Sequence, residues 1–207
     1  MTEISNLEKL EEKRKWLSNK IYITRKTRIE TNERIKRENQ FYQLINVYYS
    51  LFIVALSIIS LIYIRNDNQL FSTLLLVASI ILTMFSLYHA SKNHAERYFV
   101  TKSSYIRLDL LYSKIEYINP ESLTSELLED ILKEYHEELD KVENHTKIDY
   151  LKAKKATCVK GFTTSDCICL FWNIAIEIIR KVFLLVLPII PCVAYCLYKQ
   201  KFLSLIS

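Results

Sequence analysis

VYYSLFIVALSIISLIYI, residues 47–64, and LFSTLLLVASIILTMFSLYHA, residues 70–90, decide the fold of this chain. Neither run contains Asp, Glu, Lys or Arg, and each is close to the roughly 20 apolar residues with which an α-helix crosses a bilayer. Five polar residues, RNDNQ, join them, and so short a link connects antiparallel neighbours. A buried soluble pair is disfavoured, because a charge at mid-span costs about 2.5–3.5 kcal/mol and both runs avoid one. The sequence therefore predicts a transmembrane helical hairpin.

The composition extends the helical prediction to the rest of the chain. Glycine occurs once and proline three times among 207 residues, which is too few for the turns of an all-β protein. The polar segments carry Leu, Ile, Glu and Lys at helical spacing. We therefore expect an all-α membrane protein, in which the hairpin continues into a cytoplasmic helical bundle and a C-terminal apolar segment follows.

Four segments are expected along the chain. Residues 1–46 form a cytoplasmic N-terminal helix, 47–90 form the hairpin, 91–160 form cytoplasmic helices that pack on the N-terminal helix, and 161–207 form a membrane-associated segment. In the last segment, the charge-free run 182–198 contains Pro188 and Pro191, which would kink it. This run is either a third span or part of a helical hairpin lying in the inner interface.

The basic residues predict the orientation of the hairpin. Eleven Lys and Arg residues lie in residues 1–46, one (Arg65) lies in the link, and others follow the second run. The positive-inside rule then places both flanks in the cytoplasm. Anionic lipid already accounts for basic residues beside a membrane, so we expect a lipid bilayer as partner and no direct nucleic-acid binding. The first residues lack the apolar core of a secretory signal.

Apolar side chains spaced by three, four and seven predict how the polar helices pack. In the N-terminal helix they form a narrow stripe of Leu7, Leu10, Leu17 and Ile21. Asn119-Pro120-Glu121 predicts the start of a later helix, with Asn as N-cap and Pro at the first position. That helix is expected to continue to Gly161. Its predicted seam is Leu128, Leu132, Tyr135, Leu139, Val142 and Thr146.

Small hydroxyl side chains follow one side of each apolar run. The candidate residues are Ser50, Ser57 and Ser60 in the first run, and Ser79, Thr83 and Ser86 in the second. One interpretation is packing, because such side chains let membrane helices approach closely and share hydrogen bonds worth about 0.6 kcal/mol each. The other is a wetted pore lining, which a single hairpin cannot enclose, so this interpretation requires a homo-oligomer.

Residues that could carry catalysis, metal binding or cofactor binding are scarce. The five cysteines form no CxxC pair, and no histidine lies at a ligand spacing from a cysteine. One glycine excludes the phosphate-binding loops GxxxxGK[ST] and GxGxxG. The sequence therefore predicts a protein that is not an enzyme and that holds no metal or cofactor.

Three segments resemble a known family. KRKWLSNKIYITRKTRIETNERI precedes the hairpin, YYSLFIVALSIISL opens it, and HEELDKVENHTKIDY follows it. Over roughly residues 5–155 the chain resembles the SLATT family, bacterial two-transmembrane domains found beside nucleotide-signalling and reverse-transcriptase genes in phage-defence loci. The positions matched to the family's basic and polar pattern are Arg25, Arg28, Asn93 and Arg97. The third apolar region is expected to lie outside the family's core.

The resemblance implies an effector of anti-phage defence, placed in the bacterial inner membrane with a cytoplasmic N-terminus. A partner, either a nucleotidyltransferase product or a reverse-transcriptase system, would signal infection. The domain would then oligomerise into a pore and depolarise the membrane. One alternative is a non-conducting, membrane-tethered subunit that recruits a defence enzyme, and another is a toxin without a trigger.

Arg97 has two interpretations under the pore hypothesis. If the second apolar helix runs on into the cytoplasm, its hydroxyl face continues through Asn93 to Arg97. An oligomer would then place a ring of arginines at a pore mouth. Otherwise Arg97 anchors the topology or pairs with an acidic residue of the cytoplasmic bundle.

Overall fold

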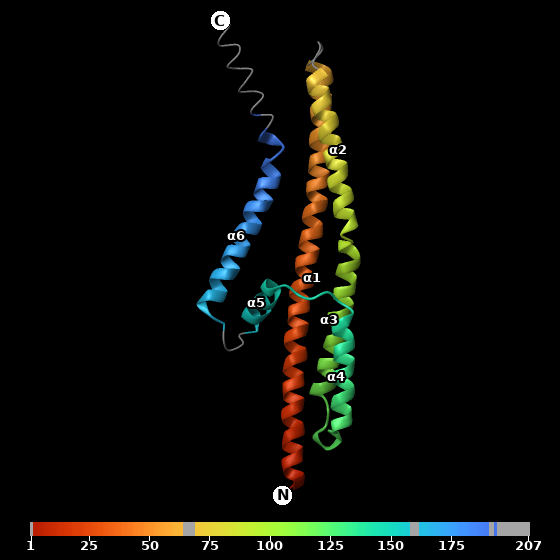
Figure 1. Ribbon diagram of the computed structural model, residues 1–207, viewed down its shortest axis with the longest axis vertical. Coiled ribbons are helices and arrows are strands. Elements are labelled where there is room, and N and C mark those ends of the chain that lie inside the picture. The colour runs from red at the N-terminus through yellow and green to blue at the C-terminus, as the bar shows by residue number, and fades with distance from the viewer. Residues whose placement is uncertain (1, 64–68, 158–161, 191–192, 194–207) are drawn as a thin grey trace. The chain divides into compact units, whose positions relative to one another are not determined.

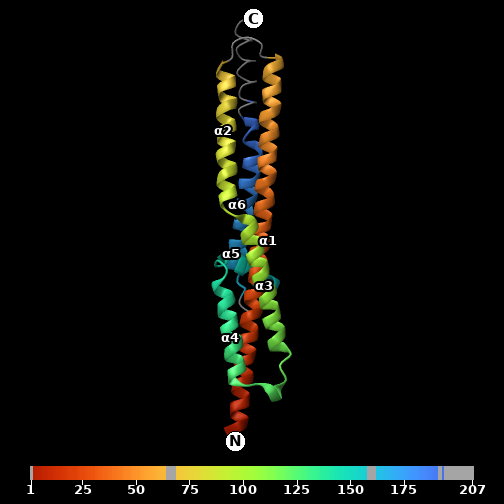
Figure 2. The ribbon, with the colours of Figure 1, turned by 90° about the vertical axis from the view of Figure 1, so that its right-hand side faces the viewer.

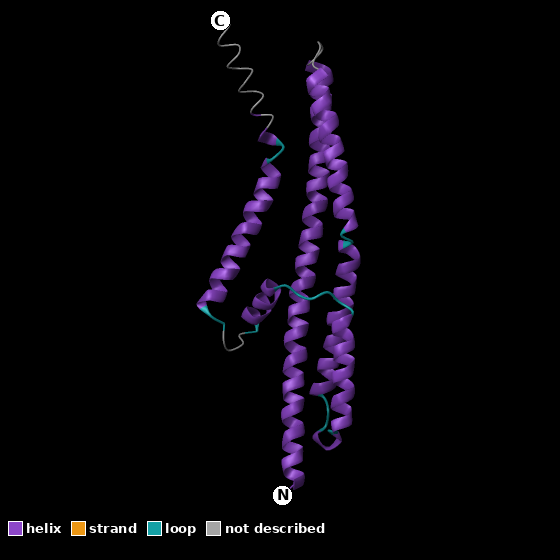
Figure 3. Cartoon of the chain, in the orientation of Figure 1, coloured by secondary structure: helices purple, strands orange, loops and turns teal. Residues whose placement is uncertain are grey.

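The computed structural model describes residues 2–63, 69–157, 162–190 and 193, and within these ranges every regular secondary-structure element is a helix (Figure 3). The predicted all-α fold is therefore confirmed. The elements are α1 (Thr2–Tyr63), α2 (Gln69–Ser91), α3 (His94–Glu116), the 3₁₀ turn η1 (Pro120–Ser122), α4 (Ser125–Asp140), α5 (Lys147–Ala156) and α6 (Thr164–Val186) (Figure 1).

The chain divides into two compact units. The first unit contains residues 1–37 and 94–170, and the second contains residues 38–93 and 171–207. Helix α1 contributes to both, because the polar N-terminal helix and the first apolar run form one uninterrupted helix of 62 residues.

The first unit has an apolar core between α1, α3 and α4, which lie side by side in two views (Figures 1 and 2). Leu17 and Ile21 of α1 are buried there, as the sequence pattern predicts, whereas Leu7 is 50% exposed. The remaining core residues are Leu108, Leu111 and Ile115 of α3, Leu123, and Leu128, Ile131 and Tyr135 of α4. Full burial of such side chains contributes about 1.5–3 kcal/mol each.

Two predicted helix boundaries in this unit are wrong. Asn119-Pro120-Glu121 begins the single turn η1 and not a long helix, and Asn119 makes no side-chain cap hydrogen bond. Helix α4 starts after Thr124, whose hydroxyl accepts a hydrogen bond from the Leu127 N–H at 3.2 Å. The side-chain oxygen of threonine satisfies an otherwise unpaired N–H at a helix start, which explains why the helix begins here.

The predicted continuous helix to Gly161 is also wrong, because α4 ends at Asp140 and α5 begins at Lys147. Thr146 is the N-cap of α5 and forms a capping box with Asp149. It therefore does not extend the packing seam as predicted, although Val142 is buried. Gly161 lies outside the described residues.

In the second unit, α1 and α2 make direct side-chain contacts. Ser86 of α2 donates a hydrogen bond to the side-chain oxygen of Asn46 of α1 at 2.5 Å. The ring of Tyr42 stacks on His89 with 3.7 Å between the ring centroids. These contacts pair the two apolar helices in the manner expected of a hairpin. Residues 64–68, which include most of the RNDNQ link, lie outside the described residues.

The apolar helices expose their large side chains. Among the described residues, two helices are long and apolar enough to cross a membrane, one within Asn6–Ser60 and one within Phe71–Glu116. The most apolar window is 6% buried in the first and 0% in the second. A core helix of a soluble protein would bury most of such a window. Low burial argues against the alternative of a buried soluble pair.

Helix α6 packs on α1 inside the second unit. The hydroxyls of Tyr48 and Tyr49 donate hydrogen bonds to the carbonyl oxygens of Leu185 and Leu184. The helix ends at Val186, two residues before Pro188, one of the two prolines predicted to kink this run. Pro191 and most of the run 191–198 lie outside the described residues, so the predicted third span over 182–198 stays a prediction.

Candidate functional site

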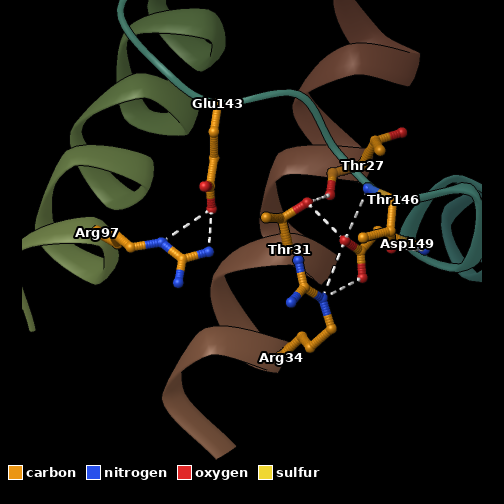
Figure 4. A network of polar contacts seen from close by, with 7 residues as sticks. All are labelled: Thr27, Thr31, Arg34, Arg97, Glu143, Thr146 and Asp149. Carbon is orange, nitrogen blue, oxygen red and sulfur yellow. Dashed lines mark hydrogen bonds and ion pairs between the residues drawn. The ribbon is translucent and has the colours of Figure 1, made fainter. Parts of the chain in front are cut away.

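A network of polar side chains in the first unit joins α1, α3 and α5 through the segment between α4 and α5. Figure 4 shows Thr31 and Arg34 of α1 facing Asp149 of α5, and Arg97 of α3 facing Glu143. The Thr31 hydroxyl also donates to the backbone carbonyl of Thr27. The core of a helical unit is normally apolar, so a polar cluster at this level needs partners for every charge.

Asp149 is the centre of the network, with a fully buried side chain. Arg34 donates to both carboxylate oxygens at 3.1 Å, and the Thr31 hydroxyl lies 3.2 Å from one of them. The backbone N–H of Thr146 donates to the same oxygen at 3.3 Å and completes the capping box. Burial alone would raise the pKa of the Asp149 carboxyl, but the bonds from Arg34 and Thr146 outweigh it and hold that pKa below its usual value.

Arg28 is the second buried ionic group, with 2% of its surface exposed. Its guanidinium donates to the backbone carbonyl of Glu143 at 2.5 Å and to that of Val142 at 3.5 Å. These carbonyls belong to the segment after α4 and have no helical donors. Burial lowers the pKa of Arg28, while Tyr135 and Glu143 act to raise it, and the net shift is downward. Arginine keeps its charge despite such a shift.

Glu143 connects two helices with one residue. Its carbonyl accepts from Arg28 of α1, and its carboxylate forms an ion pair with Arg97 of α3, in which the Arg97 Nε lies 3.1 Å from Oε1. Of the two interpretations of Arg97, the structure therefore shows pairing with an acid of the bundle. A role at a pore mouth would require this pair to open.

Arg25 and Asn93, the other residues matched to the family pattern, lie at different places. The Arg25 guanidinium contacts Asp109 of α3 at 2.8 Å, so it also links α1 to α3. Asn93 is exposed and has a φ of 46°. This left-handed conformation, which asparagine tolerates better than most residues, separates α2 from α3. The second apolar helix thus does not run on unbroken to Arg97.

The hydroxyl residues of the apolar helices mostly bond to their own helix. Ser50, Ser57 and Thr83 each donate to the carbonyl four residues earlier, at 2.8–2.9 Å. Ser79 donates to the carbonyl of Leu76 at 2.7 Å. Ser86 differs, because it bonds across to α1, and Ser60 is half-buried. Ser86 thus contributes a hydrogen bond between α1 and α2, while the other bonded hydroxyls keep acceptor lone pairs.

Sequence reasoning missed Glu143, Thr146 and Asp149. The signal was present for two of them, since Thr-x-x-Asp before a helix is a capping-box pattern. Glu143 carries no such signal, because its partners on α1 and α3 are distant in the chain. Among the described residues no group of three His, Cys, Asp or Glu side chains could hold a metal ion.

Comparison with known proteins identifies the family. A family model described as "SMODS and SLOG-associating 2TM effector domain family 5" matches residues 10–197. The comparisons with curated proteins and with solved structures found no match. The match extends beyond the predicted range of 5–155, so the expectation that the third apolar region lies outside the family's core is wrong. With two exposed apolar helices and a match over most of its length, this chain is a membrane protein that belongs to SMODS and SLOG-associating 2TM effector domain family 5.

Proposed function

We propose that this protein is a non-enzymatic effector of a bacterial anti-phage defence system, which oligomerises into a pore and depolarises the inner membrane. Its trigger would be a partner protein or a signalling nucleotide, from a nucleotidyltransferase or a reverse-transcriptase system. The family's description as an effector domain supports the general class.

The observation that carries the pore proposal is the state of the hydroxyl residues. Ser57 and Thr83 bond to carbonyls of their own helices, so they cost little in lipid while the protein is closed. Thr83 is exposed, and Ser79 is half-exposed. Each hydroxyl still has lone pairs for water when copies assemble around a common axis. Such a stripe suits both a closed and a conducting state.

The polar network of the first unit is the proposed receiver of the trigger. It holds the segment 141–146 against α1 by the hydrogen bonds of Arg28 to two backbone carbonyls, and against α3 by the ion pair of Arg97 with Glu143. A ligand shifts a conformational equilibrium only by binding one state better than the other. The trigger would therefore favour an arrangement in which the Arg97–Glu143 pair is open.

Dye release from liposomes tests the proposal. The purified wild type, with its trigger or at high protein density, should release a small trapped dye. The double variant Ser57→Leu, Ser79→Leu should insert normally but fail to release the dye. The larger, apolar leucine side chains would occupy the hydroxyl face and exclude water from it. The matched control, Ser57→Ala with Ser79→Ala, keeps the side chains small and should still assemble. Insertion without release by the wild type would contradict the proposal.

The second candidate function is a membrane-tethered subunit that recruits a defence enzyme and never conducts. The exposed apolar side chains of α3, described below, would suit it as a recruiting surface. The two functions differ in the dye experiment, since a tether leaves liposomes sealed under every condition.

A further inference from the structure

A row of apolar side chains along α3 and just after its C-terminal end stays exposed within the described part of the chain. Phe99, Ile106, Leu110 and Tyr117 are 65%, 46%, 66% and 86% exposed. Their spacing is seven, four and seven residues, with Ser103 and Ser113 at the intervening positions. These six residues, called the α3 seam below, occupy alternate a and d positions of a heptad repeat.

The α3 seam lies opposite the face by which α3 packs in the first unit. The buried residues of α3 are His94, Thr101, Ser104, Leu108, Leu111 and Ile115. In heptad terms they occupy positions b and f, which point away from a and d on a helix. Helix α3 therefore packs in the first unit through one face. Its opposite face carries exposed residues with the spacing of a coiled-coil interface.

We infer that the α3 seam is the interface with α3 of a second copy of this chain. The first reason is charge. In a parallel coiled coil, position g of one helix faces position e of the next heptad on the other. Asp109 and Lys114 occupy these positions, so the carboxylate of each copy faces the ammonium of the other. A two-fold pair makes this contact twice.

The side-chain contacts within the chain are compatible with that pairing. Asp109 and Lys114 already contact Arg25 and Glu134, but their side chains remain 55% and 46% exposed and can accept a second partner. The like-charged positions Lys102 and Arg107 would also face each other. Arg107 lies 3.3 Å from Glu138, which also pairs with Lys141 at 2.6 Å, so this carboxylate reduces part of that repulsion.

The second reason is the membrane. If all copies of this chain insert into the bilayer with the same topology, their α3 helices point in the same direction. A parallel α3 pair requires this arrangement. The α3 seam is shorter than three heptads, so it would pair weakly between free helices. Confinement to a membrane raises the effective concentration of the partner and compensates for a weak contact.

Disulfide cross-linking of the full chain in liposomes tests this inference. All five native cysteines are replaced by serine, and Leu110→Cys is compared with Lys133→Cys, an exposed position on α4 outside the α3 seam. A disulfide needs Cα atoms about 4.4–6.8 Å apart, which facing a positions reach. Mild oxidation should convert most of the Leu110→Cys chain to a dimer, with at least fivefold less from the control. Equal cross-linking would overturn the inference.

A second measurement keeps the native cysteines. Ile106→Glu with Leu110→Glu places two carboxylates in the α3 seam at positions whose exposure spares the monomer's core. The variant should shift to a smaller species in detergent, whereas Trp16→Glu, at a 53%-exposed site on α1, should not. An unchanged oligomer, including one held only by the membrane helices, contradicts the inference.

This inference rests on the self-association that the proposed function requires, but the two fail differently. If Leu110→Cys cross-links specifically but the protein never releases dye, the pore proposal is contradicted and the α3 interface is supported. If the protein releases dye but shows no specific cross-links, the pore proposal is supported and the α3 interface is contradicted. If α3 instead lies on the lipid surface through its seam, both Leu110→Cys and Lys133→Cys stay monomeric, which also overturns the inference.

Discussion

Asp149 is a buried carboxylate whose charge is required by its surroundings. Replacement by Asn keeps the size but removes the charge that Arg34 and the Thr146 N–H stabilise. Hydrogen bonds to charged groups contribute about 1.5–3 kcal/mol, so Asp149→Asn should destabilise the protein by about that amount. Urea unfolding followed by circular dichroism in detergent measures the loss. Glu126→Gln, an exposed acid on α4, is the control and should change little.

The same residue predicts a pH dependence of stability. The pKa of Asp149 is lower in the folded protein than the usual value of about 3.9 in an unfolded chain. Its contribution is therefore fully present above about pH 3.9 and is lost as pH falls through the lower, folded value. Wild type should lose stability over this acid range more steeply than Asp149→Asn. Parallel curves for the two proteins would contradict the assignment.

Arg28 and Arg97 both contact Glu143 but should differ in importance. Glu143→Gln removes the exposed ion pair to Arg97 and keeps the backbone carbonyl that Arg28 binds, so it should cost less than about 1 kcal/mol. Arg28→Met leaves the Val142 and Glu143 carbonyls without their donor and should cost about 1–3 kcal/mol. Thermal unfolding of the two variants checks the order, and a larger loss from Glu143→Gln would refute it.

At the scale of the helices, local sequence predicts the apolar segments and their helical state. It fails where partners come from elsewhere in the chain. Val142 and Thr146 continue the apolar spacing of Leu128 to Leu139, so periodicity hides the break after Asp140. Only the Thr146–Asp149 capping box indicates that break. The burial of Arg28 is equally invisible, because its acceptors lie 114 and 115 residues away.

The end of α6 shows a similar long-range dependence. Pro188 has no N–H, so the Leu184 carbonyl four residues earlier lacks its helical donor. The Tyr49 hydroxyl of α1 donates to that carbonyl instead. Because of the proline, the Leu184 carbonyl has no helical donor and accepts from the Tyr49 hydroxyl instead. This hydrogen bond links α6 to α1.

This arrangement predicts a coupling between Tyr49 and Pro188. Tyr49→Phe should destabilise the protein by about 0.6–1.5 kcal/mol in the wild-type background. In a Pro188→Ala background the loss should be smaller, because the substituted alanine can donate its own N–H to the Leu184 carbonyl. A double-mutant cycle from thermal unfolding in detergent measures the difference. Equal losses in the two backgrounds would mean that the Tyr49 bond does not replace the missing donor.

At the scale of the whole molecule, the composition of the first unit constrains the topology. Residues 1–37 and 94–170 pack into one unit, although the apolar runs of α1 and α2 lie between them in the chain. Two segments that pack together must be on the same side of a membrane. An even number of crossings therefore separates them, as a hairpin of two spans provides. The basic residues of 1–46 favour the cytoplasm as that side.

Cysteine labelling tests this topology. In the cysteine-free chain, Lys9→Cys on α1 and Lys133→Cys on α4 should both resist a membrane-impermeant maleimide in intact spheroplasts. Both should react in inverted vesicles, because the cytoplasmic side then faces the reagent. Detergent permeabilisation, after which both sites should react in either preparation, is the control. Labelling of one site from each side would require an odd number of crossings and would be incompatible with a first unit formed from both segments.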